Sequence, residues 1–183
     1  MAATIAERLY GRFLSTVPLF SGLSTEVISA LCLRCKPLLA MKNQTIIKQG
    51  QHGTEMYLLM SGEAEVSEQH GEKQVQLGFL SEGAFFGEAA VLRNPEDGNG
   101  GHGALRTRTV RAVTESELCY LLKDDVHALY IPYPELHARL ARFVSSSRVL
   151  NDRTIAKLDL TRNQMQVRAP PPHAASWPPP AVS

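Results

Sequence analysis

The spacing of hydrophobic residues changes twice along the chain. Up to about residue 36, apolar residues recur every three or four positions, which predicts helices. Between residues 38 and 122 the pattern becomes short apolar and β-branched runs separated by glycine-containing turns, which predicts strands. Helical spacing returns after residue 123. The pattern therefore predicts an α+β fold, in which a small antiparallel barrel or jelly roll is flanked by helices on both sides in the sequence.

Two helices are predicted before the strands. The first covers residues 5–14 and ends before Pro18, and the second follows the N-cap residue Ser24 and ends at Pro37. The apolar residues expected on the faces of these helices are Ile5, Leu9, Phe13, Val27, Ile28, Leu31 and Cys35.

The strands are predicted to be short and regularly spaced. Residues 45–47 are all β-branched, and residues 56–60 form an apolar run typical of a buried strand. Gly62, Gly71 and Gly83 mark the turns that follow. Gly50 and Gly53 are expected to bracket another tight turn.

The C-terminal part is predicted to contain two helices and a tail. Asp124 is expected to cap a helix that runs to about Tyr130, and a longer helix begins near Pro134 and continues to about Leu158. Its apolar stripe consists of Leu136, Leu140, Phe143 and Val144.

Three segments are therefore expected. A helical lead-in covers residues 1–22, the main domain residues 23–160, and a proline-rich tail residues 161–183. The tail contains two Pro-Pro-Pro runs and little that can pack, so we expect it to be disordered or polyproline-like.

One stretch combines glycine with arginine in the pattern of an anion cradle. Gly87 allows a ligand to approach the backbone closely, and residues 88–92 can form one helical turn whose free N–H groups favour a phosphate. Glu88 can accept hydrogen bonds from a sugar hydroxyl. The arginines of the segment 106–111 (RTRTVR) can each hold two phosphate oxygens.

These residues resemble a known family. The run Phe86-Gly87-Glu88, followed by Arg106-Thr107 and Val110-Arg111-Ala112, resembles the phosphate-binding cassette of cyclic nucleotide-binding domains. The Arg-Thr pair and the segment LCYLLKDDV over residues 118–126 look most like the cyclic nucleotide-gated and hyperpolarisation-activated channel branch. The resemblance covers about residues 13–151. It implies a β-roll that holds the nucleotide and a C-terminal helix that closes over it as a lid.

The resemblance also implies a role for each cassette residue. Glu88 is expected on the ribose 2′-hydroxyl, and Arg106 is expected on the phosphate. Thr107 is expected on the phosphate and on the amino group of a syn guanine, so both cAMP and cGMP are candidate ligands. Gly87 and Ala89 complete the expected cassette contacts.

Arg108 is the alternative phosphate clamp. In an extended segment Arg106 and Arg108 point to the same side, and only the family pattern selects Arg106. The family usually has a small residue at the position of Arg108, so this arginine either strengthens phosphate binding or crowds the pocket. The loop 94–105, which is longer than usual in the family, contains His102 and is expected to be a mobile connection.

The resemblance assigns four further candidate contacts. Val66 and Leu80 align with positions that pack on the base and sugar, and both are equally expected in a hydrophobic core. Arg148 and Asn151, with the neighbouring Asp152, fall near lid positions that contact the base. Ser147 stands where the hyperpolarisation-activated branch often has arginine, so the base preference is left open.

Composition excludes several classes of function. The 183 residues carry a net charge of +1, so no bulk charge attracts nucleic acid or acidic membranes, and recognition of an anion must be local. No apolar run approaches the roughly 18 residues of a membrane span. The N-terminus has no signal core and only a faint transit-peptide character. We expect a cytoplasmic location, on the cytosolic face of the membrane if the chain belongs to a channel.

Catalysis and metal binding are not expected. The thiols Cys32, Cys35 and Cys119 are odd in number and fit core positions better than a disulfide framework or a zinc site. No Ser/His/Asp order and no nucleoside triphosphate loop supports an enzyme. No cofactor is expected besides the ligand, cAMP or cGMP.

The expected function is reversible cyclic nucleotide binding, which shifts the lid helix and thereby biases an attached effector. The chain resembles the ligand-sensing part of a cyclic nucleotide-regulated cation channel, with channel or other effector subunits as partners and a homo-oligomer formed through a linker outside this chain. Two alternatives stay open. One is a kinase-regulatory-type subunit, although no Arg-Arg-x-Ser inhibitor sequence is present. The other is a degenerate β-roll that binds no nucleotide and acts as an interaction module.

Overall fold

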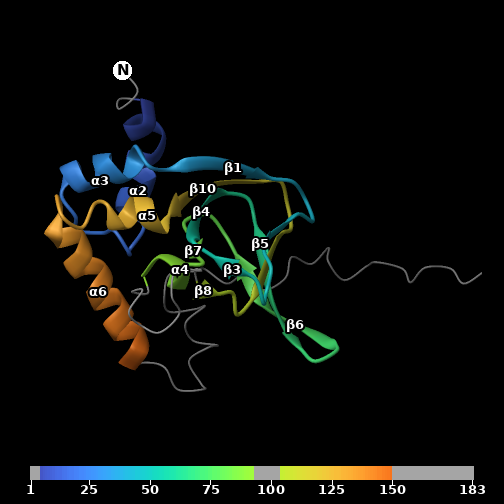
Figure 1. Ribbon diagram of the computed structural model, residues 1–183. Coiled ribbons are helices and arrows are strands. Elements are labelled where there is room, and N and C mark those ends of the chain that lie inside the picture. Colours follow the sequence, from blue (N-terminus) through green and yellow to red (C-terminus); the bar gives the residue numbers. More distant parts are fainter. Residues whose placement is uncertain (1–4, 93–103, 150–183) are drawn as a thin grey trace, which may run out of the picture.

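The computed structural model describes residues 5–92 and 104–149, with the backbone alone for 144–149. Figure 1 shows the strands gathered on one side of the molecule and most of the helices on the other. The predicted α+β class, an antiparallel β-roll flanked by helices, is confirmed.

The N-terminal helical segment consists of a π-helical part, η1 (Glu7–Gly11), followed by α2 (Arg12–Thr16). The segment ends before Pro18, as predicted. The predicted face is wrong at Ile5 and Leu9, which are 61% and 57% exposed, whereas Phe13 is half-buried and packs against the core. Tyr10 and Leu14 are buried instead. In a π-helix each hydrogen bond spans five residues rather than four, so the four-residue stripe read from the sequence is not maintained.

Helix α3 (Thr25–Cys32) begins where the sequence predicts. The Ser24 hydroxyl accepts a hydrogen bond from the Val27 N–H, which is the capping bond expected of this residue type. The helix ends earlier than predicted, however, so Cys35 lies outside it. Pro37 lies within strand β1 (Lys36–Ala40), where a proline is tolerated because β1 is at the edge of its sheet.

The strands of the described part of the chain form three sheets. One has the order β1-β10-β4-β7, the second β2-β9-β5-β6, and the third pairs β3 with β8. The remaining strands are β2 (Thr45–Ile47), β3 (His52–Gly53), β4 (Glu55–Ser61), β5 (Ala64–His70), β6 (Lys73–Leu80), β7 (Phe85–Phe86), β8 (Ala104–Leu105), β9 (Thr109–Ala112) and β10 (Ser116–Leu122).

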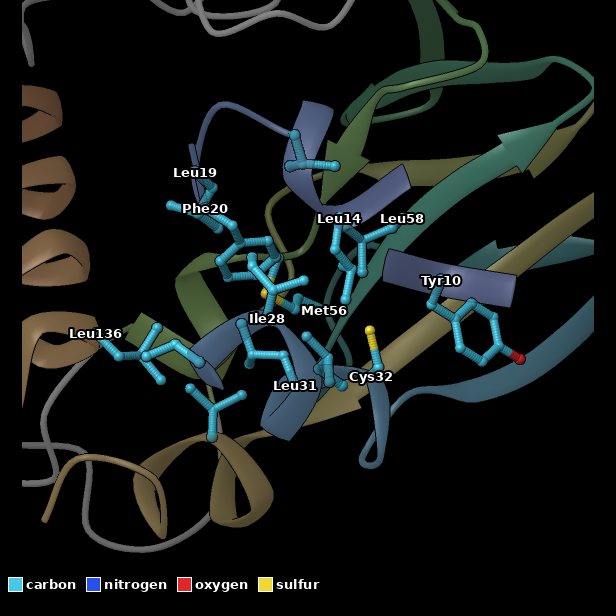
Figure 2. Packing of buried hydrophobic residues seen from close by; sticks show 14 of the residues in the cluster. Tyr10, Leu14, Leu19, Phe20, Ile28, Leu31, Cys32, Met56, Leu58 and Leu136 are labelled. Carbon is cyan, nitrogen blue, oxygen red and sulfur yellow. The ribbon is translucent and has the colours of Figure 1, made fainter. Parts of the chain in front are cut away.

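Strand β4 separates two hydrophobic cores. Met56 and Leu58 face the helices and belong to the outer core, whereas Tyr57 and Leu59 face the interior of the roll and belong to the inner core. Both faces are buried, which explains why the sequence reads as a continuous apolar run rather than an alternation. Figure 2 shows the outer core, where Met56 and Leu58 lie close to side chains of the N-terminal helices.

Three helices complete the described fold: α4 (Ala89–Leu92), α5 (Lys123–His127) and α6 (Pro134–Val149). The prediction that Asp124 caps α5 is wrong. The N-cap position is Leu122, which makes no side-chain capping bond, and Asp124 lies in the first turn, where the helix dipole favours a negative charge. The predicted start of α6 at Pro134 is confirmed.

Helix α6 is anchored to the turn between the N-terminal helices. The Arg139 guanidinium donates hydrogen bonds to the carbonyl of Pro18 at 2.6 Å and to the Ser21 hydroxyl at 3.0 Å. Leu136 and Leu140 are buried in the outer core, as the predicted stripe requires. Anchoring therefore combines apolar burial with hydrogen bonds from Arg139 to the turn at Pro18 and Ser21.

Several predictions fall outside the described part of the chain. They are residues 94–103 of the predicted loop, the continuation of α6 to Leu158, the tail 161–183 and the side chain of Val144. The predicted extension of the loop to Leu105 is wrong, because Ala104 and Leu105 form β8 paired with β3. Among the described residues, no helix combines the length and the apolar character that a membrane crossing requires.

Leu31 and Leu33 offer a matched test of the outer core. Leu31 is fully buried, whereas Leu33 is 52% exposed. Leu31→Ala should lower the free energy of unfolding by about 2–5 kcal/mol, because it removes apolar contacts and leaves a cavity. Leu33→Ala should change it by less than about 0.5 kcal/mol. Urea unfolding followed by circular dichroism measures both, and equal losses would contradict this packing.

Candidate functional site

The cassette predicted around Gly87 is formed where β7 ends and α4 begins. Gly87 has a φ angle of +76°, a conformation that residues with a Cβ adopt rarely. The carbonyls of Gly87 and Glu88 accept the first hydrogen bonds of the short turn, from Ala90 at 3.1 Å and Val91 at 3.0 Å. The predicted single helical turn after Gly87 is thus present.

Arg106 lies between β8 and β9 and is 7% exposed. Its Nη1 donates to the carbonyl of Gly87 at 3.0 Å. Its Nη2 donates to the Glu55 carbonyl at 2.7 Å and to the Glu55 carboxylate at 3.0 Å. The guanidinium group thus joins the cassette turn to the first residue of β4.

Arg106 and Arg108 are not equivalent in the structure. Residues 106–108 lie outside the regular strands, and Arg108 is half-buried, in contrast to the nearly complete burial of Arg106. Of the two predicted clamps, Arg106 donates a hydrogen bond to Gly87.

Glu55 is a site residue that sequence reasoning missed. Its carboxylate accepts hydrogen bonds from the Thr54 N–H at 2.9 Å and the Tyr57 hydroxyl at 3.0 Å, in addition to the one from Arg106. Burial raises the pKa of this carboxyl. The Thr54 and Tyr57 hydrogen bonds and the Arg106 charge outweigh burial, so the pKa lies below its ordinary value. One signal was available, since Glu55 directly precedes the predicted strand 56–60 and shares a face with Tyr57 once the strand is extended by one residue.

Tyr57 connects this polar group to the inner core. Its ring stacks on Phe86 with centroids 5.4 Å apart, and its hydroxyl is held by Glu55. Burial and the negative charge of Glu55 both raise the pKa of the Tyr57 phenol, so it remains a hydrogen-bond donor at neutral pH. The position of the Glu55 carboxylate is therefore set by a hydrogen bond from Tyr57, whose ring packs in the inner core.

Two glycines provide the space that Arg106 occupies. A Cβ at Gly53 would overlap the Nη2, Nε and Cζ atoms of Arg106, and a Cβ at Gly87 would lie 2.6 Å from Nη1. The guanidinium therefore packs directly against both backbones. The sequence predicts only that Gly53 brackets a turn. In the structure Gly53 belongs to strand β3, and its backbone packs against the Arg106 side chain.

The other predicted ligand residues differ in how far they are buried. Glu88 is half-buried, and Ala89 and Thr107 are exposed. Val66 and Leu80 are buried in the inner core, which is one of the two placements expected for them. The side chains of Ser147 and Arg148, together with Asn151 and Asp152, lie outside the described part.

Comparison with known families agrees with this geometry. A sequence model described as "Cyclic nucleotide-binding domain" matches residues 39–133, which include Gly53, Glu55, Gly87 and Arg106. The chain belongs to the cyclic nucleotide-binding domain family.

Its relatives include ion-channel subunits. Over 135 residues the chain is 30% identical to the cyclic nucleotide-gated channel cone photoreceptor subunit alpha of Gallus gallus, covering 74% of this chain and 18% of that protein. The match to human cyclic nucleotide-gated channel alpha-3 is also 30% identical over 135 residues, covering 74% of this chain and 19% of that protein. The chain thus spans about a fifth of the length of the curated relatives it matches.

Solved structures show the same fold at lower identity. The N-terminal domain of a transcriptional regulator from Streptomyces coelicolor A3(2) has a TM-score of 0.65 and 23% identity, covering 78% of this chain and 94% of that one. The regulatory domain of Toxoplasma gondii PKA, crystallised with cAMP, has a TM-score of 0.64 and 19% identity, covering 81% and 51%.

Gly53→Ala tests whether the guanidinium packs directly on this backbone. The added methyl group must displace Arg106 and disturb its buried hydrogen bonds, so we expect a loss of about 1–3 kcal/mol in the free energy of unfolding. The matched control is Gly11→Ala, whose Cβ would lie 3.9 Å from the Cys32 sulfur and should leave stability unchanged or raised. Urea unfolding measures both, and an unaffected Gly53→Ala protein would contradict the close packing.

The lowered pKa of Glu55 predicts a pH dependence of stability. A carboxyl whose pKa is lower in the folded state stabilises the fold above its unfolded-state value, and this contribution is lost as the pH falls through the folded-state value. Wild type should therefore be more stable than Glu55→Gln at about pH 7, and the difference should shrink below about pH 4. Unfolding midpoints of both proteins at several pH values measure the difference in stability. Because both proteins share all other carboxyl groups, the contributions of those groups cancel in the difference. A difference that grows on acidification would reverse the sign assigned here.

Proposed function

We propose that this chain is a cyclic nucleotide sensor that binds cAMP or cGMP reversibly and performs no covalent chemistry. The observation that carries the proposal is the buried Arg106 guanidinium, held beside the Gly87 turn inside the region that matches the family. A fixed cation next to a glycine turn suits a phosphate, because little reorganisation is required when the anion arrives.

The ligand is proposed to occupy the roll beside this turn. Arg106 has more N–H groups than its three side-chain bonds to described residues use, so it can share donors with a phosphate oxygen. Glu88 is assigned to the ribose hydroxyl and Thr107 to the phosphate and to a syn guanine. Gly87 and Ala89 supply backbone contacts.

The base and sugar are assigned to less polar surroundings. Val66 and Leu80, from the inner core, are proposed to pack against them. Arg148 and Asn151 are proposed to contact the base from the lid. Titration with cAMP and with cGMP distinguishes adenine from guanine as the preferred base.

Helix α6 is proposed to report occupancy of the site. The Phe143 ring meets the Phe85 ring edge-on, with centroids 5.8 Å apart, and Phe85 belongs to the strand that leads into Gly87. A shift of the cassette on binding would therefore change the packing of α6. Such coupling requires that the ligand bind one helix position more tightly than the other.

The proposed effector is a cyclic nucleotide-regulated cation channel, with this chain as a cytosolic sensing part. Channel subunits match about three quarters of the chain at 30% identity, whereas the kinase-regulatory likeness is a likeness of fold. A kinase-type regulatory role is the second candidate. An interaction module that binds no nucleotide is the third, favoured by the fact that Arg106 already has internal acceptors.

Calorimetric titration with cAMP and cGMP tests the function. Loss of a charge-assisted hydrogen bond of roughly 1.5–3 kcal/mol predicts that Arg106→Ala weakens binding by about 10- to 100-fold. Arg108→Ala is the control and should have a far smaller effect. Absence of heat and of any thermal shift at millimolar ligand would leave the interaction module as the better description. A larger effect of Arg108→Ala would show that Arg108, and not Arg106, is the phosphate clamp.

A further inference from the structure

The proposed anion site contains an anion of its own. The Glu55 carboxylate lies 3.0 Å from Arg106 Nη2, so the two charges of this pair cancel. A site intended only to attract phosphate would leave the arginine charge uncompensated. The carboxylate therefore needs an explanation beyond holding the arginine, since the carbonyls of Gly87 and Glu55 already accept hydrogen bonds from the guanidinium.

The position of this carboxylate is strongly determined. One oxygen accepts hydrogen bonds from the Tyr57 hydroxyl and Arg106, and the other accepts bonds from the N–H and the hydroxyl of Thr54. Its lowered pKa keeps it ionised at neutral pH. Because Arg106 cannot leave the pair without abandoning buried bonds, the negative charge remains near the guanidinium when a ligand arrives.

We propose that Glu55 selects between ligands by their charge. It makes the site bind a phosphate diester, such as a cyclic nucleotide, in preference to a phosphate monoester. The inference rests on the proposed function and extends it to a specificity-determining residue.

The physical basis is the dependence of Coulomb energy on ligand charge. A cyclic phosphate diester carries one negative charge. A monoester carries about −1.5 to −2 near pH 7, since its second pKa is about 6. Repulsion from Glu55 is proportional to ligand charge, so it acts about twice as strongly on the monoester. In terms of affinity, the factor for a dianion is the square of the factor for a monoanion.

The experiment compares cAMP with 5′-AMP on wild type and on Glu55→Gln, by calorimetry at about pH 8 and low salt, where the monoester is a dianion. Glutamine keeps an oxygen that can accept from Arg106 and Tyr57, and it removes the charge. We expect Glu55→Gln to bind cAMP about 5-fold more tightly and 5′-AMP about 25-fold more tightly, so that the preference for the diester falls about 5-fold.

Glu65→Gln is the matched control, because it removes the same charge from an ion pair between β5 and β9. Glu65 lies 3.3 Å from Arg111, and that pair is not linked to Arg106 by a described hydrogen bond. Both affinities and their ratio should remain those of wild type. Glu55→Asp keeps the charge and should retain the diester preference, which provides a second measurement if the glutamine variant is unstable.

The outcomes separate this inference from the function on which it rests. An equal change for both nucleotides, or weaker binding of both to Glu55→Gln, would overturn the inference, because Glu55 would then act only by positioning Arg106. Wild type that binds neither cAMP nor cGMP would instead refute the proposed function and, with it, any selection by Glu55. A selective gain for 5′-AMP in Glu55→Gln alone supports the assignment.

Discussion

The burial of one arginine imposes most of the constraints on the candidate site. Arg106 is 7% exposed, and a charge in that environment is tolerated only if its donors find acceptors. The acceptors come from two distant parts of the sequence, Gly87 after β7 and Glu55 at the start of β4. The guanidinium therefore links the cassette turn, the central strand and the segment before β9.

This link explains residues that otherwise look unrelated. Gly53 and Gly87 leave room for the guanidinium, and Glu55 balances its charge. Tyr57 holds Glu55 and stacks on Phe86, the residue before Gly87. The result is a closed set of contacts in which the polar centre is positioned by the inner hydrophobic core.

The two cores connect this centre to the helices. In strand β4 the Tyr57 side chain packs in the inner core and the Leu58 side chain packs in the outer core. The same strand therefore contacts both the candidate site and the helical layer. Phe85 and Phe86 divide in the same way, with Phe85 meeting Phe143 of α6. Because interiors are close-packed, displacement of this short strand affects both layers. That arrangement gives the proposed sensor a physical route from the cassette to α6.

Local sequence signals determined the class of fold, most turns, the N-cap of α3 at Ser24 and the start of α6 at Pro134, because caps, prolines and glycines act through their own backbone. The family pattern also located the cassette around Gly87 and Arg106.

Local signals failed where tertiary packing determines the conformation or the role of a residue. The buried face of the first helix depends on π-helical bonding, and the end of α3 depends on the pairing of β1 with β10. Glu55 and Gly53 were missed because their roles depend on contact with Arg106, about 50 residues away in the sequence. Only the tertiary structure brings these groups together, since desolvation of the guanidinium requires acceptors and space wherever the fold can supply them.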